Sequence, residues 1–246
     1  MLNPSNITTN GIEGSSVAAL ASPAVETTEQ LLQLIEKEYQ QSLLNPLPTG
    51  RWRSLSEMDL WYLLCRCILS EVRYETALSV VEFFRNNGQL NPYLLASYGK
   101  AAKKDLTAKL SALLESKKEG RQYSQYFVAN AKILLSGDYS LSALLNECRS
   151  GYQARKQLCS IFQGVGLKEA SMFLRDSCYA HDTIVVDGPI LKYLQIVDPP
   201  LVEADVSLSQ INQSNYLMLE YLFCGYCETR GANPQRMERA IRKVLK

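Results

Sequence analysis

A short glycine turn between two helical patterns constrains the fold of this chain more than any other feature. Apolar residues recur at intervals of three and four up to Phe162, and the same spacing resumes at Leu167 after the turn Gly164-Val165-Gly166. Two glycines allow a turn to adopt positive φ angles and to bring successive main-chain N–H groups close to a phosphate. The pattern predicts a helix, a phosphate-binding hairpin and a second helix, although a tight turn without a ligand would have the same sequence.

Two ionisable residues near this turn are candidates for chemistry. Lys168 begins the second helix, and Asp187, nineteen residues later, follows a β-branched segment and precedes a predicted helix, Gly188 to Gln195. A lysine near a phosphate-binding turn in partly apolar surroundings can lose its charge and act as an amine nucleophile. The alternatives are a solvated lysine and an aspartate that caps its helix. A cap would also fix the carboxylate, so capping and catalysis are compatible.

The composition is that of a soluble globular protein. The 246 residues suffice for one large domain or two small ones, and 46% of them are hydrophobic and 21% charged. No apolar run approaches the roughly 20 residues that span a bilayer. No basic cluster precedes an apolar segment at the N-terminus, so neither a membrane partner nor secretion is expected.

Charge is distributed unevenly along the chain. The first fifty residues hold five glutamates and one lysine. The chain from Arg51 onward therefore contains 25 of the 26 basic side chains but only 20 of the 25 acidic ones. A folded body with a positive excess can bind a polyanion if the charges gather on one face. Many proteins without a nucleic-acid partner carry as much, so the charge permits such a partner without indicating one.

The cysteine and histidine content narrows the chemistry. Seven cysteines are scattered through apolar segments, which indicates free thiols rather than a disulfide framework. Cys224 and Cys227 have metal-like spacing, but no second Cys or His pair accompanies them, so no metal site on side chains is predicted. The single histidine, His181, argues against Ser-His-Asp and Cys-His nucleophile systems. Catalysis would therefore use lysine and carboxylates.

The pattern of apolar residues predicts an all-α protein. Residues 1–26 are rich in Ser, Thr, Asn, Pro and Gly and read as a disordered leader. About ten helices, with little strand signal, are expected over residues 27–246, in two helical lobes with the hairpin motif (about 154–195) at the cleft between them. The expected helices include a central buried one after Ser56, one from Ser124 to Leu135 that follows a Lys-rich helix end, one over Asn215–Cys227, and a short basic one from Gln235 to Lys246.

The hairpin residues resemble the helix-hairpin-helix DNA glycosylase superfamily, in which a Gly-x-Gly-x-Lys motif is followed by an aspartate. The flanking residues 166–175 and 190–192 are similar to the archaeal-type 8-oxoguanine DNA glycosylase/lyase family. The stretches 61–69 and 121–132 resemble that family's first central helix and middle helix. The similarity covers roughly residues 50–195, with an echo in the last four residues.

The resemblance implies a mechanism and a partner. Lys168 would attack C1′ of a flipped nucleotide, expel the damaged base and form a Schiff base that permits β-elimination. Asp187 would stabilise positive charge at the sugar, and Gly164, Val165 and Gly166 would hold a phosphate, in this superfamily often through an alkali cation. The partner would be double-stranded DNA with a damaged base, bound by a monomer in the cytoplasm (at the nucleoid) or the nucleus. The closely spaced cysteines of an iron–sulfur cluster are missing, so no such cluster is expected.

The chain also departs from the family pattern. Gly188-Pro189 stands where Arg-His usually follows the aspartate, and Met172 stands where a histidine is usual. In that family the chain stops soon after a helix that carries a tryptophan, and the carboxylate of a terminal lysine helps to read the base. By position, Phe223, Tyr226 and Lys246 are the candidates for the base pocket here, although core packing is the alternative for both aromatics.

We therefore predict a bifunctional DNA glycosylase with associated β-elimination lyase activity, which acts on an oxidised purine, with 8-oxoguanine as the expected base. One alternative is a non-catalytic helix-hairpin-helix module that binds DNA and has lost the pocket, as Gly188-Pro189 and Met172 suggest. Another is a glycosylase for a different modified base.

Overall fold

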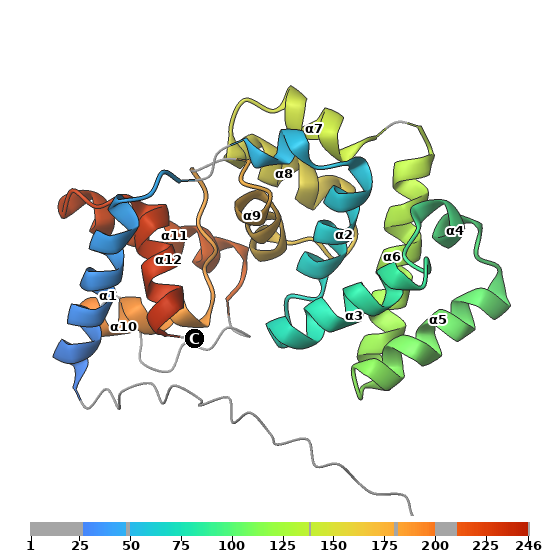
Figure 1. Ribbon diagram of the computed structural model, residues 1–246, viewed down its shortest axis with the longest axis horizontal. Helices are drawn as coiled ribbons and strands as arrows, with labels where there is room; N and C mark the ends of the chain where they lie inside the picture. The colour runs from blue at the N-terminus through green and yellow to red at the C-terminus, as the bar shows by residue number, and fades with distance from the viewer. Residues whose placement is uncertain (1–26, 48–49, 138, 180–181, 200–210, 246) are drawn as a thin grey trace, which may run out of the picture.

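The protein is a bundle of helices in two lobes (Figure 1). The computed structural model describes residues 27–47, 50–137, 139–179, 182–199 and 211–245. Over these ranges the chain forms twelve α-helices and one 3₁₀ helix, and no β-strand. The all-α fold predicted from the sequence is confirmed. The predicted leader, residues 1–26, lies outside the described residues. Among the described helices, none combines the length and the apolar character needed to span a bilayer.

The elements follow one another with short connections. In chain order they are α1 (Thr28–Leu43), η1 (Arg51–Ser54), α2 (Glu57–Ile68), α3 (Tyr74–Asn86), α4 (Pro92–Ser97), α5 (Lys100–Leu113), α6 (Lys117–Leu135), α7 (Leu141–Glu147), α8 (Gly151–Ile161), α9 (Leu167–Asp176), α10 (Gly188–Val197), α11 (Gln213–Thr229) and α12 (Pro234–Val244).

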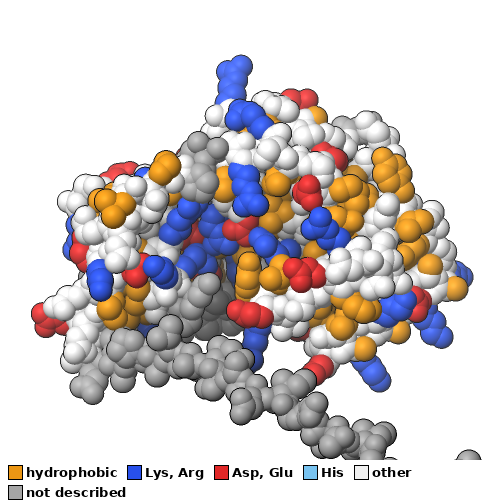
Figure 2. Space-filling model, viewed as in Figure 1, with side chains coloured by type: hydrophobic (Ala, Val, Ile, Leu, Met, Phe, Trp, Pro, Cys, Tyr) orange, Lys and Arg blue, Asp and Glu red, His pale blue; other side chains and the backbone are white. Residues whose placement is uncertain are grey.

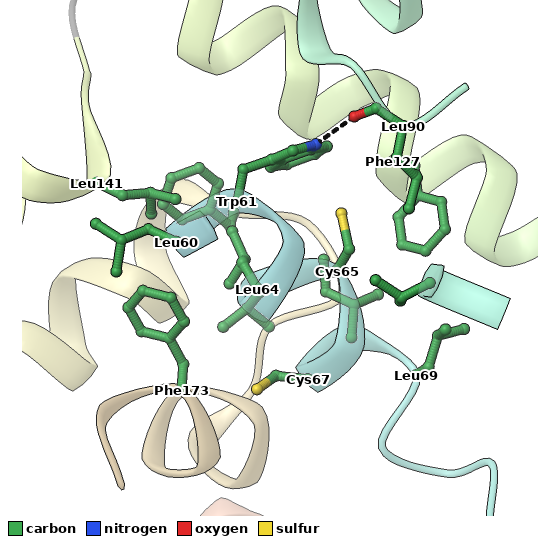
Figure 3. Packing of buried hydrophobic residues seen from close by; sticks show 14 of the residues in the cluster. Leu60, Trp61, Leu64, Cys65, Cys67, Leu69, Leu90, Phe127, Leu141 and Phe173 are labelled. Carbon is green, nitrogen blue, oxygen red and sulfur yellow. Dashed lines mark hydrogen bonds between the residues drawn. The ribbon is translucent and has the colours of Figure 1, made fainter. Parts of the chain in front are cut away.

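The larger lobe is built around α2. A capping box begins this helix, because the Ser56 side chain accepts from the N–H of Asp59 while the Asp59 carboxylate accepts from the N–H of Ser56. Half of its twelve residues are buried, on more than one side, as expected for a central helix. Trp61 is fully buried, and its indole N–H donates to the carbonyl of Leu90 at 2.6 Å (Figure 3).

The smaller lobe brings the two ends of the described chain together. Helices α1, α10, α11 and α12 enclose a second buried cluster, on the left in Figure 1. Asn233, at the N-cap of α12, donates its main-chain N–H to the Tyr39 hydroxyl of α1 at 3.0 Å. Lys243 pairs with Glu38 across the same two helices. The lobe is therefore closed by contacts of long sequence separation.

Helix α6 begins earlier than its apolar pattern predicts. The apolar pattern predicted a start at Ser124, with the preceding lysines at the end of another helix. The structure shows that α6 starts at Lys117. Glu115, with φ +52°, ends the preceding helical path, and the Ser116 side chain accepts from the Glu119 N–H. Gly120 permits the close crossing of α5, because a Cβ there would lie 2.4 Å from the Ser111 nitrogen. A polar first turn of this kind escapes a search for apolar periodicity.

Candidate active site

The hairpin between α8 and α9 is held against α6. Gly164 has φ +74°, and a Cβ at that position would lie 2.4 Å from the ring of Tyr126 on α6. Glycine is therefore required both by the left-handed backbone and by the close approach of the ring. Gly166 differs, because its φ of −93° suits any residue and a Cβ would meet only the flexible end of Glu169.

A buried asparagine fixes the same hairpin from α6. Asn130 is fully buried, and its side-chain amide donates to the Gln163 carbonyl at 2.9 Å. Its side-chain oxygen accepts from the Gln163 N–H at 2.8 Å. The main-chain groups of one hairpin residue are thus both satisfied by one side chain. Val165 completes the anchor, since its side chain packs into the core of the larger lobe.

The hairpin leaves two main-chain donors open. The Gly166 N–H donates to the Glu169 carboxylate at 2.9 Å, and the Ser70 hydroxyl donates to the other oxygen of that carboxylate at 2.5 Å. The N–H groups of Gly164 and Val165 have no acceptor among the described residues. Of the three predicted phosphate-binding residues, these two therefore have free N–H groups, while that of Gly166 is engaged within its own helix turn.

Lys168 lies in the first turn of α9 beside the loop that joins α2 and α3. Its ammonium pairs with the Glu71 carboxylate at 2.8 Å and lies 3.5 Å from the carbonyl of Ser70. The lysine side chain is 18% exposed, whereas Glu71 is 69% exposed. The nucleophile predicted from the sequence is thus mostly enclosed, whereas solvent surrounds most of the Glu71 side chain that pairs with it.

A cavity of about 470 Å³ joins the hairpin, the start of α9 and the start of α11. This volume is within the range of small-ligand sites. Its lining residues are Glu71, Cys159, Val165, Gly166, Leu167, Lys168, Glu169, Val186, Ile211, Asn212, Gln213 and Tyr216. Lys168 is the one amine among these residues. The structure therefore brings the predicted nucleophile and part of the predicted phosphate-binding turn to one cavity.

The thiol and the phenol that line the cavity favour their neutral forms. Burial raises the pKa of the Cys159 thiol to about 11, so at neutral pH the sulfur is a poor nucleophile. Burial also raises the pKa of the Tyr216 phenol well above its ordinary value. Among the lining residues, the lysine is thus better suited than the thiol to covalent chemistry.

The segment before Asp187 is extended but belongs to no sheet, and α11 satisfies much of its backbone. The Glu220 carboxylate accepts from the Ile184 N–H at 2.8 Å. The Tyr216 hydroxyl accepts from the Val186 N–H at 3.1 Å and donates to the Ile184 carbonyl at 3.0 Å. Glu220 is itself buried and paired with Arg155 of α8 at 2.8 Å. These contacts take the place of the main-chain hydrogen bonds that a β-branched segment usually forms with a neighbouring strand.

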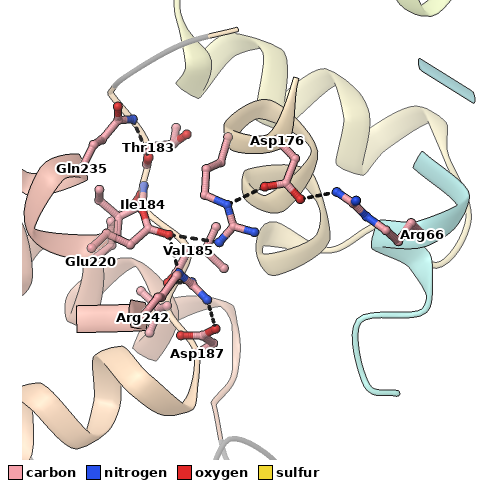
Figure 4. Close-up of polar contacts among 12 residues, drawn as sticks. Arg66, Asp176, Thr183, Ile184, Val185, Asp187, Glu220, Gln235 and Arg242 are labelled. Atoms are coloured by element: carbon pink, nitrogen blue, oxygen red, sulfur yellow. Dashed lines mark hydrogen bonds and ion pairs between the residues drawn. The ribbon is translucent and has the colours of Figure 1, made fainter. Parts of the chain in front are cut away.

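Asp187 occupies the N-cap position of α10 without making cap hydrogen bonds. Pro189 at N2 has no N–H to offer, so one of the usual partners of a capping carboxylate is missing. One carboxylate oxygen, Oδ2, instead forms an ion pair with Nη1 of Arg242 on α12 (Figure 4). The other, Oδ1, is buried and has no hydrogen-bond partner in the described structure. Asp187 does not line the cavity itself but directly follows Val186, which does.

The predicted base-pocket residues lie elsewhere. Phe223 is fully buried in the core of the smaller lobe, against Tyr193. Tyr226 contacts the same tyrosine, and the Arg230 guanidinium lies 3.5 Å from the centre of its ring. Neither aromatic lines the cavity, and the α11 aromatic that does is Tyr216. The role of Phe223 and Tyr226 in a base pocket stays a prediction. Lys246, the third candidate, lies outside the described residues.

The cysteines and Met172 take no part in the cavity apart from Cys159. Met172 packs against the core of the larger lobe. Burial raises the pKa of Cys224 to about 11 and that of Cys227 to about 12. Within the described ranges no group of three or more His, Cys, Asp or Glu side chains is arranged to hold a metal ion.

The comparisons with known proteins agree with this fold. The family model for 8-oxoguanine DNA glycosylase matches residues 49–232, which is most of the chain. The chain belongs to the 8-oxoguanine DNA glycosylase family. The resemblance seen in the hairpin residues is thereby confirmed over residues 49–232. No curated protein matches the chain in a sequence comparison.

Solved structures of 8-oxoguanine DNA glycosylases share this fold at low sequence identity. The Methanocaldococcus jannaschii 8-oxoguanine DNA glycosylase superposes with a TM-score of 0.65 at 18% identity, covering 89% of this chain and 93% of that one. The M. jannaschii glycosylase/lyase in complex with a 15mer DNA containing 8-oxoguanine gives 0.60 at 18%, covering 85% and 88%. The Thermotoga maritima enzyme gives 0.60 at 18%, covering 89% and 91%. The two-lobed helical architecture is therefore that of this family.

Proposed function

We propose that the protein excises 8-oxoguanine from double-stranded DNA and then cleaves the strand by β-elimination through a Schiff base on Lys168. The observation that carries the proposal is the place of this amine, which lies in the first turn of α9, in a cavity shared with the hairpin. The family of the chain and the lesion DNA bound to its M. jannaschii structural relative support the choice of substrate.

The proposed reaction begins with the lysine amine. Once the Lys168 ammonium has left Glu71 and given up its proton, the lone pair of Nζ attacks C1′ of the flipped nucleotide and the bond to the base breaks. The base departs with the electron pair and takes a proton. The C1′–O4′ bond then breaks as the nitrogen lone pair forms the C1′=Nζ iminium, and O4′ takes the proton that Nζ loses. Loss of the C2′ proton to solvent sends the C2′–H electron pair toward the iminium, and the 3′ phosphate leaves with the C3′–O electron pair by β-elimination. Asp187 would stabilise the positive charge that develops at the sugar.

The hairpin would hold the DNA backbone. The open N–H groups of Gly164 and Val165 lie next to the N-terminus of α9, where main-chain donors and the helix dipole both favour a phosphate. Figure 2 shows Lys and Arg side chains gathered over the junction of the two lobes, interleaved with some acidic ones. The main-chain carbonyls of the hairpin are hard oxygen donors that suit an alkali cation, whose role would be to help bind the phosphate. These features fit a contact with the DNA backbone that does not depend on the base sequence.

The start of α11 would contact the extruded base. Asn212, Gln213 and Tyr216 line the cavity from this helix and offer amide and hydroxyl groups. An oxidised purine differs from guanine in groups that donate and accept hydrogen bonds, which such side chains can distinguish. The Asn212 side chain already caps α11 by accepting from the Asn215 N–H, and the Tyr216 hydroxyl already bonds the main chain of Val186 and Ile184. Gln213 is therefore the freest of the three candidates.

A panel of duplexes, each with one lesion, tests the proposed function. We expect base release and strand cleavage on the 8-oxoguanine duplex, with no cleavage by Lys168→Gln. Lys156→Gln is the matched control, because this lysine is exposed on α8 and outside the cavity. Release of a different base by the wild type would support the proposed chemistry but show that the substrate is not 8-oxoguanine. Release of no base would reject the proposal.

A non-catalytic DNA-binding module remains the second candidate. The observation in its favour is that both candidate catalytic groups are already paired, Lys168 with Glu71 and Asp187 with Arg242. This alternative predicts equal affinity for lesion-bearing and undamaged duplexes, with a strong salt dependence. It also predicts that Asp187→Asn changes stability without changing any reaction on DNA.

A further inference from the structure

We infer that Arg242 is the positioning residue for Asp187, and that a line of alternating charges running through α12 and α9 holds Arg242 in turn. The inference rests on the proposed function, in which Asp187 stabilises charge at the sugar. Arg242 lies on α12, for which the sequence predicted only a short basic helix near the end of the chain.

The first step is that α10 does not fix the carboxylate of Asp187. The residue stands at the N-cap, yet its side chain accepts no hydrogen bond from the first turn of the helix. Pro189 removes one donor from that turn. A carboxylate without cap bonds can rotate about its side-chain torsions, so another group must set its direction if it is to act on a substrate.

Arg242 supplies that constraint at two points. One nitrogen, Nη1, pairs with Oδ2 of Asp187, and another, Nη2, donates to the Val185 carbonyl at 3.0 Å. The planar guanidinium therefore fixes the carboxylate and the main chain two residues before it in one rigid geometry. Arg242 is 19% exposed and Asp187 is 17% exposed, so water screens the pair less than a surface ion pair.

Arg242 is oriented by a buried carboxylate. Its Nε donates at 2.9 Å to Glu238, one turn earlier on α12, and Glu238 is 1% exposed. Arg175 of α9 donates to the same oxygen at 3.2 Å. A buried carboxylate with two guanidinium partners is satisfied only while both stay in place, which restricts the rotamer of Arg242.

The line continues into the larger lobe (Figure 4). Arg175 pairs with Asp176 at 2.7 Å, and Asp176 pairs with Arg66 of α2 at 2.5 Å. Burial alone would lower the pKa of the Arg175 guanidinium, but Asp176 and Glu238 offset this and raise that pKa above its ordinary value. Arg175 therefore stays charged, and the position of Arg242 depends on groups from both lobes.

The arrangement leaves one oxygen of Asp187 for the reaction. Oδ2 is held by Arg242, while Oδ1 is buried and lacks a hydrogen-bond partner in the part of the chain that the structure describes. A buried oxygen without a partner is costly unless a ligand uses it. Oδ1 is then the oxygen that Arg242 leaves available, and Arg242 acts through Asp187 without touching the substrate.

The test compares Arg242→Met with Lys243→Met in the full-length protein. Each variant removes one positive charge from α12, but Lys243 pairs with Glu38 of α1 and is 66% exposed. Single-turnover release of 8-oxoguanine, affinity for undamaged duplex and melting temperature are measured for both. We expect Arg242→Met to release the base about tenfold to a hundredfold more slowly, as is common when an orienting partner is lost. Duplex affinity should change less than about twofold, Arg242→Lys should recover part of the rate, and Lys243→Met should match the wild type.

A double-variant cycle separates positioning from a structural role. If Arg242 acts through Asp187, Arg242→Met slows Asp187→Asn no further, because the group that it positions is already gone. Full additivity of the two rate losses, or a wild-type rate in Arg242→Met, overturns the inference while leaving the proposed function in place. A wild type that releases no base from any lesion overturns the proposed function and the inference with it.

Discussion

The side chain of Asn130 forms two hydrogen bonds with the main chain of Gln163, at 2.9 and 2.8 Å, and so ties α6 to the hairpin. The contact spans 33 residues of sequence and is buried on the asparagine side. It explains how a turn of four residues can keep one shape at the edge of a cavity.

Asn130→Ala should destabilise the protein and loosen the hairpin. The substitution removes two hydrogen bonds to the main chain of Gln163, each of which contributes about 0.5–1.5 kcal/mol. Urea unfolding measures the loss. Asn87→Ala is the control, because the Asn87 side chain bonds only the Phe83 carbonyl within its own helix turn and is exposed. Equal losses in the two variants would contradict the anchoring role of Asn130.

Gly164→Ala should weaken DNA binding as well as stability. A Cβ would meet the Tyr126 ring at 2.4 Å, in addition to the strain of φ +74°. Gly88→Ala isolates the second effect, because Gly88 has φ +65° with nothing within 4 Å of its Cβ. We expect about 1 kcal/mol from the backbone strain in both variants, a larger loss in Gly164→Ala, and weaker duplex affinity only there. Fluorescence anisotropy on an undamaged duplex measures the affinity.

Glu71→Gln should leave excision intact or speed it. The Glu71 carboxylate is 69% exposed and holds the Lys168 ammonium, so the contact must break before the amine attacks. Because exposed pairs contribute little to stability, the melting temperature should stay close to that of the wild type. Glu75→Gln, in the exposed first turn of α3, is the control. A rate lower than that of the control would show that Glu71 takes part in the reaction.

Modification of Cys159 should depend steeply on pH. Burial raises its pKa to about 11, so the thiolate fraction grows about tenfold for each pH unit below that value. Iodoacetamide labelling followed by peptide mass spectrometry should show slow reaction at pH 7 and a rising rate up to about pH 11. Because Cys159 lines the cavity, labelled protein should lose duplex-dependent activity in proportion. Rapid labelling at pH 7 would mean that the thiol is not enclosed.

Arg155→Met should destabilise the protein more than a surface substitution. Arg155 and Glu220 are 3% and 4% exposed, and Arg155 also donates to the Ser171 hydroxyl at 3.1 Å. Removing one partner of a buried pair leaves an uncompensated charge and costs about 3–5 kcal/mol. Denaturant unfolding measures the loss, with Lys109→Met as the control for an exposed ion pair. A loss below about 1 kcal/mol would show that Glu220 finds other partners.

The features that the sequence could predict are local ones. The hairpin lies between two apolar-periodic runs, and its Gly-x-Gly-x-Lys spacing fixes Lys168 at the start of a helix whatever the rest of the chain does. The buried helix α2 is likewise evident from its apolar residues and its capping Ser56. Both follow from residues within a few turns of each other.

The contacts that complete the site span long stretches of sequence and leave no periodic signal. Asp187 is 55 residues from Arg242, and Val186 is 30 residues from Tyr216. Helical spacing also cannot say which aromatic of α11 reaches a cavity, because several sides of that helix are apolar. Phe223 and Tyr226 were predicted for the base pocket from the family resemblance of this helix, whereas Tyr216, a few turns earlier, lines the cavity.

Borohydride trapping with peptide mapping tests the central claim most directly. The protein is incubated with an 8-oxoguanine duplex and borohydride, and the covalent complex is digested with trypsin. An amine joined to sugar is not cleaved by trypsin, so the account predicts an adduct on an uncut peptide that begins at Gln157 and ends at Arg175, with the sugar on Lys168. An adduct on another lysine, or no adduct while the base is released, would contradict it.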